Sequence, residues 1–155
     1  MEGGTVETQK GQLAAPCGLY CGVCAIYIAH RDDNLKFKER LTGLYGVGMD
    51  DLHCKGCLSD NVFLYCRVCP IKACTAGKGI AGCHQCADFP CAHIDSFPFP
   101  VGKRVILRSI PAWRELGTDQ WMEAEEKRYH CPRCGNALFR GAKRCRSCGE
   151  ATDMD

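Results

Sequence analysis

Eight cysteines lie close together between Cys54 and Cys91, and this cysteine-rich block constrains the fold more than any other feature of the sequence. Six of them form C-x-x-C pairs, in which a tight turn directs two thiolates toward one point, the usual arrangement for binding zinc or iron. The eight are Cys54, Cys57, Cys66, Cys69, Cys74, Cys83, Cys86 and Cys91. Burial alone cannot offset the ordering entropy of so short and irregular a segment, so we expect metal to replace much of its core.

The chain has fifteen cysteines in 155 residues, a content typical of either disulfide-rich or metal-binding proteins. Residues 1–15 are polar and contain no apolar stretch, which predicts a disordered arm and neither a signal peptide nor an anchor. No apolar run approaches the length of a membrane span. We therefore expect a cytoplasmic protein without membrane contact, whose cysteines bind metal and do not pair as disulfides.

A second cysteine group precedes the block, with the spacing C-x-x-x-C-x-x-C. Its members are Cys17, Cys21 and Cys24. A short helix is predicted directly after it, over residues 25–30. Asn34 is a suitable N-cap for a longer helix over 35–45, and Gly46 is a suitable stop. We expect these two helices to supply most of the ordinary hydrophobic core.

The region after the block has the apolar spacing of helices. It predicts one helix over 101–109, a further turn that Pro111 opens and Gly117 ends, and another helix over 118–129. This last helix leads into His130 without a flexible linker.

The C-terminal part contains two C-x-x-C-Gly knuckles separated by ten residues, formed by Cys131 with Cys134 and by Cys145 with Cys148. This spacing is typical of a four-cysteine zinc ribbon, and each glycine suits the left-handed turn after a second ligand. Residues 136–140 are predicted to form the strand between the knuckles. Because four protein ligands leave no open position, we expect the metal to be structural.

These elements together predict a small metal-stabilised α+β fold. In it, short helices surround zinc knuckles and are followed by a helix and a zinc ribbon. The expected organisation is a disordered arm at 1–15, a cysteine-rich metal-binding domain with C-terminal helices at 16–129, and the ribbon at 130–150.

Basic residues concentrate around the ribbon. The net charge of the chain is +2, yet residues 127–149 contain seven lysines and arginines and no acid, which leaves −5 for the remainder. This asymmetry allows the ribbon to contact nucleic acid through a phosphate-binding face, with Phe139 as a stacking residue. The candidate contact residues are Arg133, Arg140, Lys143, Arg144 and Arg146.

The cysteine motifs resemble a cysteine-rich domain-of-unknown-function family found in bacteria and archaea. The resemblance covers about Pro16 to Ile94, and the helix that leads into the Cys-Pro-x-Cys-Gly knuckle is similar to an extension in some members. The motifs are Cys17-Gly-Leu-Tyr-Cys21-Gly-Val-Cys24, Cys54-Lys-Gly-Cys57, Cys66-x-x-Cys69-Pro-Ile-x-x-Cys74 and Cys83-x-x-Cys86-x-x-Phe-Pro-Cys91. The resemblance implies a zinc-binding domain whose biochemical role is not established.

Eleven cysteines remain when the ribbon is set aside. Two four-cysteine sites would leave three of them free, whereas three sites need twelve ligands and therefore one histidine. His53, His84 and His93 all lie beside cysteines, and His93 is the foremost candidate. One grouping joins Cys54, Cys57, Cys66 and Cys69, and leaves Cys74, Cys83, Cys86 and Cys91 as another set, but the spacing equally allows interleaved pairings. We expect three or four zinc ions in total.

Three functions are compatible with this sequence. The first is a metal-stabilised interaction or scaffold module, and the second is an iron–sulfur or redox protein. The Cys17–Cys24 run has the spacing of radical S-adenosylmethionine enzymes, but these need a barrel of roughly 200 residues. The third is nucleic-acid binding by the basic ribbon. The sequence contains no H-E-x-x-H, G-x-S-x-G or phosphate-loop motif, so we do not expect an enzyme.

Overall fold

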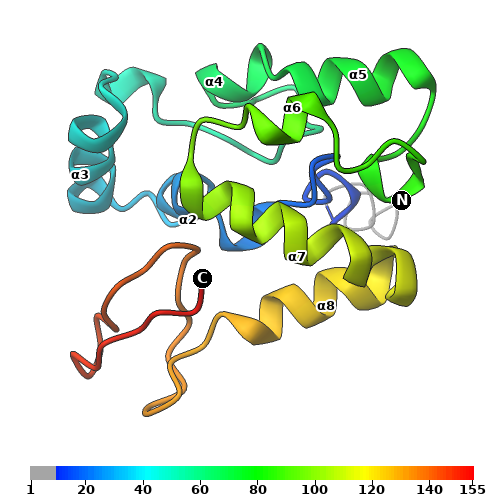
Figure 1. The fold of residues 1–155 in the computed structure, drawn as a ribbon. Helices are drawn as coiled ribbons and strands as arrows, with labels where there is room; N and C mark the ends of the chain where they lie inside the picture. Colours follow the sequence, from blue (N-terminus) through cyan, green and yellow to red (C-terminus); the bar gives the residue numbers. More distant parts are fainter. Residues whose placement is uncertain (1–9) are drawn as a thin grey trace, which may run out of the picture.

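The computed structural model describes residues 10–155, and this part of the chain is mostly helical with little strand (Figure 1). Its 3-10 helices are η1 (Cys21–Val23), η2 (Met49–Asp51) and η3 (Cys83–Gln85), and its α-helices are α2 (Ala25–Arg31), α3 (Leu35–Tyr45), α4 (Leu64–Arg67), α5 (Pro70–Lys78), α6 (Ala92–Asp95), α7 (Pro100–Leu116) and α8 (Thr118–Arg128). In this range the β component of the predicted α+β fold is limited to three isolated antiparallel bridges. Helix α7 crosses the middle of the molecule in Figure 1, with α4 to α6 on one side and α8 and the ribbon on the other.

The helices predicted before the block are confirmed. Helix α3 begins after Asn34, whose side-chain oxygen accepts a hydrogen bond of 3.0 Å from the N–H of Phe37. It ends at Gly46, which has the left-handed φ of 68° that glycine adopts without strain. Local capping chemistry therefore fixes both ends of this helix.

Helix α7 is longer than predicted, and the expected break at Pro111 is wrong. The helix continues through this proline to Leu116. Proline removes one backbone hydrogen bond from a helix, but Ile110 and Trp113 on either side of Pro111 are buried. Burial of these two neighbours in the core therefore keeps the helix continuous.

The main hydrophobic core lies between α7 and α8. The rings of Trp113 and Trp121 stack with their centroids 4.0 Å apart. The ring of His84 also stacks on Trp113, with a centroid distance of 3.7 Å. The indole N–H of Trp121 donates a hydrogen bond of 2.7 Å to the hydroxyl of Ser109. Helices α2 and α3 were expected to supply most of the core, but they contribute a second, smaller cluster.

The predicted arm at 1–15 is described only from residue 10 onward, and residues 1–9 lie outside the described part. Ala14 and Ala15 are buried, so this end of the predicted arm packs against the domain. The carbonyl of Gln12 accepts a hydrogen bond from the N–H of Leu58. A Cβ at Gly56, where φ is 118°, would lie 2.6 Å from that carbonyl oxygen. Close backbone approach therefore requires glycine in the Cys54–Cys57 turn.

The ribbon packs onto the helical part through residues between its two knuckles. The ring of Phe139 lies 5.1 Å from that of Phe37 on α3. The backbone N–H of Arg140 donates to the carbonyl of Val23 at 2.7 Å. Leu138 and Ala142 belong to the same buried cluster as α7 and α8.

Among the described helices, none is long and apolar enough to cross a membrane.

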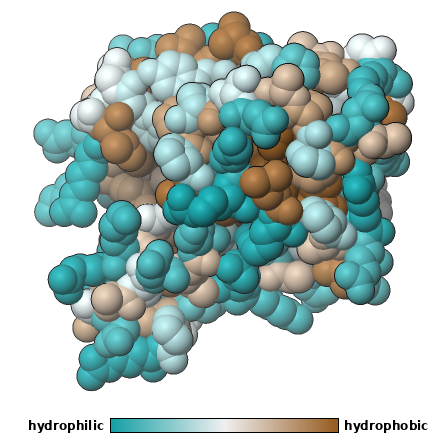
Figure 2. Space-filling view, in the orientation of Figure 1, coloured by the Kyte–Doolittle hydropathy of each residue, from teal (hydrophilic) through white to brown (hydrophobic). Residues whose placement is uncertain are grey.

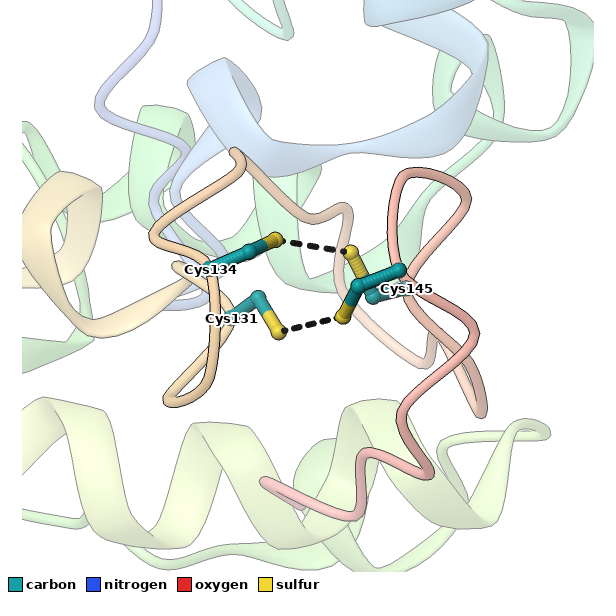
Figure 3. A group of neighbouring side chains, drawn as sticks. Cys131, Cys134 and Cys145 are labelled. Atoms are coloured by element: carbon teal, nitrogen blue, oxygen red, sulfur yellow. Dashed lines mark hydrogen bonds between the residues drawn. The ribbon is translucent and has the colours of Figure 1, made fainter.

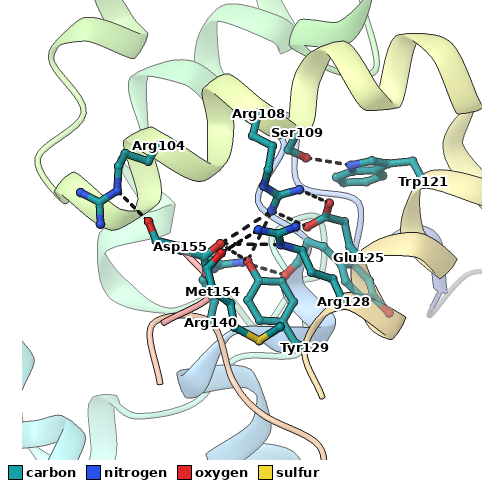
Figure 4. A network of polar contacts seen from close by, with 11 residues as sticks. Arg104, Arg108, Ser109, Trp121, Glu125, Arg128, Tyr129, Arg140, Met154 and Asp155 are labelled. Atoms are coloured by element: carbon teal, nitrogen blue, oxygen red, sulfur yellow. Dashed lines mark hydrogen bonds and ion pairs between the residues drawn. The ribbon is translucent and has the colours of Figure 1, made fainter. Parts of the chain in front are cut away.

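An ion-pair network joins α7, α8 and the last residues of the chain (Figure 4). Both terminal nitrogens of Arg108 contact the carboxylate of Glu125, at 2.7 and 3.1 Å. The hydroxyl of Tyr129 donates a hydrogen bond of 2.9 Å to Asp155, and Arg128 lies 3.9 Å from the same carboxylate. The paired geometry of Arg108 and Glu125 is the strong form of a carboxylate–guanidinium contact.

We predict that Glu125→Gln lowers the free energy of unfolding by about 1.5–3 kcal/mol, the usual contribution of a hydrogen bond to a charged group. Glu125 is buried, so the substitution leaves Arg108 without its main counter-charge. Urea denaturation monitored by circular dichroism measures the change. The matched control is Glu123→Gln on the same helix, whose exposed pair with Lys127 is worth about 0.3–0.5 kcal/mol. Equal effects of the two substitutions would contradict the prediction.

Candidate metal centre

The four ribbon cysteines come together as predicted (Figure 3). Their sulfur atoms all lie within 4.8 Å of one another, with 3.6 Å between Cys131 and Cys148 and 3.5 Å between Cys134 and Cys145. A tetrahedral ion with metal–sulfur bonds of about 2.3 Å holds its sulfurs about 3.8 Å apart. The cluster could therefore hold one metal ion, and four sulfurs in this geometry suit zinc or iron.

The two knuckles have the same local structure. The N–H of Gly135 donates to the carbonyl of Cys131 at 2.8 Å, and the N–H of Gly149 donates to the carbonyl of Cys145 at 2.9 Å. Both glycines are left-handed, with φ of 77° and 76°. The predicted turn after each second ligand is therefore confirmed. Each knuckle then closes with an isolated antiparallel bridge.

Backbone amides stabilise thiolates in the ribbon. The N–H of Cys148 is the main cause that lowers the pKa of Cys145 to about 6, and the N–H of Cys134 lowers the pKa of Cys131. The N–H of Glu150 also lowers the pKa of Cys148, but desolvation and hydrogen bonds with the three other sulfurs raise it to about 12. Four thiolates this close together need a cation to be ionised at the same time.

A second group of cysteines surrounds a cavity of about 100 Å³ in the family-like part of the chain, which we call the central cavity. Two of the residues that line it are joined by a hydrogen bond, which the backbone N–H of Cys57 donates to the sulfur of Cys21 at 3.4 Å. Arg140 reaches this cavity from the ribbon. The seven cysteines that line it are Cys17, Cys21, Cys24, Cys54, Cys57, Cys66 and Cys69.

Burial makes the thiols of the central cavity hard to ionise without a metal. It raises the pKa of Cys17 to about 12 and that of Cys57 to about 11, and it raises the pKa of Cys21 well above its usual value. Burial alone would lower the pKa of Arg140, but the neighbouring Cys24 and Cys21 raise it overall. A bound cation that replaces the thiol protons would therefore be stabilised by several sulfurs at once.

A third group surrounds a small cavity of about 20 Å³ and contains Cys74, Cys83, Cys86 and Cys91. These four formed one of the sets that the sequence left open. The ammonium group of Lys78 donates to the sulfur of Cys86 at 3.3 Å. Burial is the main cause that raises the pKa of Cys83 to about 11, and the negative charge of the nearby Cys91 thiolate raises it further.

The three candidate histidines occupy different environments. His93 lines the small cavity and is also exposed to solvent. A ring nitrogen of His53 contacts the side-chain oxygen of Asn61, and the ring of His84 stacks on Trp113. His93 is therefore the histidine that the structure places among the third group of cysteines, and its ligation stays a prediction.

The five basic residues proposed to contact nucleic acid do not form one free face. Arg140 is the correction, because its guanidinium points inward and donates to the carbonyl of Tyr20 at 2.9 Å. The other four are exposed on the ribbon surface. Arg133 lies 3.1 Å from the carboxylate of Glu150, and Arg144 donates a hydrogen bond to the carbonyl of Gly149. The guanidinium of Arg146 lies over the ring of Phe37, and Lys143 is exposed.

Phe139, the predicted stacking residue, packs on the ring of Phe37 and is only partly exposed. The ribbon surface in view in Figure 2 is largely hydrophilic. Nucleic-acid binding therefore stays a prediction, without Arg140. Sequence analysis missed the inward position of Arg140 because nothing in a run of basic residues distinguishes the one that turns toward the interior.

Neither a curated protein nor a solved structure matches this chain. One family model does, described as a protein of unknown function (DUF3795), and it matches residues 13–96. The matched region contains all the cysteines of the central cavity and of the third group, and it ends before the ribbon. It confirms the resemblance that the cysteine motifs indicated over about Pro16 to Ile94. The chain therefore belongs to the DUF3795 family of proteins of unknown function.

Proposed function

We propose that this protein is a zinc-stabilised interaction module that has no catalytic metal. The observation that carries the proposal is the closed set of four sulfurs in the ribbon. Four protein ligands complete the tetrahedral coordination of a zinc ion and leave no coordination position for a substrate. Cys131 and Cys145 are buried residues of the main core cluster, which supports a structural use of the metal.

Zinc content tests the metal part of the proposal. We expect about three or four zinc ions per chain and little iron, as the number of thiolate ligands requires. Elemental analysis after anaerobic purification from medium containing both metals measures this content. A brown protein with stoichiometric iron and sulfide would overturn the assignment, because soft thiolate ligands suit either metal.

An apolar groove supports the interaction part of the proposal. It encloses about 560 Å³ between α3, α4 and the segment before α7. Four aromatic rings form a continuous series along it, with centroids 6.1 Å apart for Tyr65 and Tyr45, 6.0 Å for Tyr45 and Phe99, and 6.1 Å for Phe99 and Phe97. Val68, which also lines the groove, is 79% exposed.

This groove fits an extended proline-rich segment of a partner protein. Aromatic-lined grooves bind such segments because proline rings pack on flat aromatic faces, and the polyproline helix loses little entropy on binding. The hydroxyl of Tyr65 donates to the carbonyl of Tyr45 at 2.6 Å, which fixes the first ring of the series. A groove formed in advance lowers the entropic cost of binding.

Fluorescence anisotropy with a labelled ten-residue peptide containing P-x-x-P tests this recognition. We expect saturable binding, and Tyr65→Ala or Phe99→Ala should each weaken it about tenfold, as the loss of an aromatic contact does at an interface. Leu107→Ala is the matched control, since Leu107 is also exposed but does not line the groove. Binding that is no stronger than that of an alanine-substituted peptide would refute the recognition and leave the zinc assignment intact.

A further inference from the structure

We propose that three arginines of α7 and α8 form a binding site for an acidic peptide in which an apolar residue directly precedes an aspartate, and that residues 153–155 occupy this site as a built-in ligand. The arginines are Arg104, Arg108 and Arg128, and we call the open cleft of about 460 Å³ beside them the arginine cleft. This inference goes beyond the proposed function, because it adds a second recognition site whose ligand is charged and does not enter the aromatic groove.

The segment in the arginine cleft is held through its main chain. Residues 153–155 cross the cleft without regular secondary structure (Figure 4). Arg128 donates a hydrogen bond of 2.6 Å to the carbonyl of Met154, and Nε of Arg104 donates one of 2.8 Å to the carbonyl of Asp155. Such main-chain contacts supply affinity for any extended peptide, and the side chains then supply specificity.

The side-chain carboxylate of Asp155 makes the first specific contact. This side chain is only 4% exposed, and the hydroxyl of Tyr129 donates to its Oδ1 at 2.9 Å. The guanidinium groups of Arg108 and Arg128 each lie 3.9 Å from the same oxygen. Guanidinium groups match the planar geometry of a carboxylate, so the cleft favours an acidic side chain at this position.

The residue before the aspartate makes the second specific contact. Met154 is partly buried and packs against the main core cluster. It lines both the arginine cleft and a smaller cavity of about 30 Å³, which Leu138 and Ala142 also line. A peptide ligand therefore needs an apolar side chain directly before its acidic residue. Leucine suits this position as well as methionine, because the two have similar volumes.

Residues 153–155 satisfy the site incompletely, which allows a partner peptide to displace them. Oδ2 of Asp155 is buried and receives no hydrogen bond from any described residue. A buried polar atom without a partner costs free energy, so a peptide whose carboxylate engages both oxygens binds better. Arg108 lies 2.7 Å from Glu125, and it therefore keeps a counter-charge when Asp155 leaves the cleft.

A built-in ligand raises the concentration of partner peptide that binding requires. While residues 153–155 fill the arginine cleft, only a small fraction of the chain can bind a peptide there. The apparent Kd rises in proportion as this fraction falls. Release of residues 153–155 therefore controls access to the site.

Fluorescence anisotropy with two labelled, amidated peptides tests the site. One copies residues 150–155, and the other is an unrelated acidic peptide in which leucine directly precedes aspartate. We expect both to bind a chain that ends at Thr152, and to bind the full chain about tenfold more weakly. Asparagine in place of that aspartate should also weaken binding about tenfold, as the loss of a hydrogen bond to a charged group does. Binding of the copied peptide alone would reduce residues 153–155 to a structural latch and overturn the proposal.

Substitutions in the full chain make the test independent of truncation. Asp155→Ala should tighten binding of the leucine peptide about tenfold, because it weakens the built-in ligand while Glu125 keeps Arg108 paired. Adding Arg128→Gln should abolish this gain. Adding Lys127→Gln should not, and it is the matched control because Lys127 is the exposed neighbour with the same charge. Equal affinities of the unchanged chain and the Asp155 variant would refute the built-in ligand, and equal effects of the two added substitutions would refute the site.

Discussion

Replacing Cys145 by serine is expected to release the ribbon metal and to detach the ribbon from the helices. Cys145 is 2% exposed and lies in the main core cluster, next to the sulfur of Cys134 at 3.5 Å. Zinc binding to a structural four-ligand site contributes about 10–16 kcal/mol to the folding of a small module. Weak local packing cannot replace a contribution of that size in a segment with only two isolated bridges.

Two measurements check this result. Native mass spectrometry should show one metal ion fewer per chain. Hydrogen exchange should show that the amides of Gly135, Gly149 and Arg140 lose protection, because their carbonyl partners lie in the knuckles and at Val23. Ser147→Ala is the matched control, since Ser147 lies between the ligands and is exposed. Unchanged protection of these amides in the Cys145 variant would show that packing alone holds the ribbon in place.

Features fixed by neighbouring residues could be predicted from the sequence. The ribbon sulfurs meet because each C-x-x-C turn and its left-handed glycine form locally, and ten residues suffice to fold one knuckle over the other. The ends of α3 depend on the side chain of Asn34 and the backbone of Gly46, both adjacent to the helix. In these cases the interaction that decides the structure lies within a few residues of its own signal.

Features that depend on distant contacts were missed. Helix α7 passes through Pro111 because its neighbours Ile110 and Trp113 are buried in the main core cluster, an effect that local propensity does not include. Arg140 turns inward because carbonyls more than a hundred residues earlier accept its hydrogen bonds. The seven cysteines of the central cavity come from three separate motifs, and their grouping depends on how those motifs fold together.

Replacing Trp121 by alanine is expected to lower the free energy of unfolding by about 3–5 kcal/mol, as for other buried aromatic residues. Trp121 is 0% exposed and stacks on Trp113 with an angle of 3° between the rings. Domains of this size have about 5–15 kcal/mol of stability in total, so this loss is a large fraction. Thermal unfolding monitored by circular dichroism measures the effect. Leu116→Ala is the control, because Leu116 lies on α7 but is 39% exposed.

A double-mutant cycle with Ser109 separates ring packing from hydrogen bonding at the same position. Trp121→Phe keeps an aromatic ring but removes the N–H that donates to the Ser109 hydroxyl at 2.7 Å. Ser109 is 0% exposed, so each single substitution leaves a buried polar partner unsatisfied at a cost of about 1–3 kcal/mol. The pair Trp121→Phe with Ser109→Ala removes both partners, and its loss of stability should therefore be smaller than the sum of the two single losses. Additive losses would show that this hydrogen bond does not couple α7 to α8.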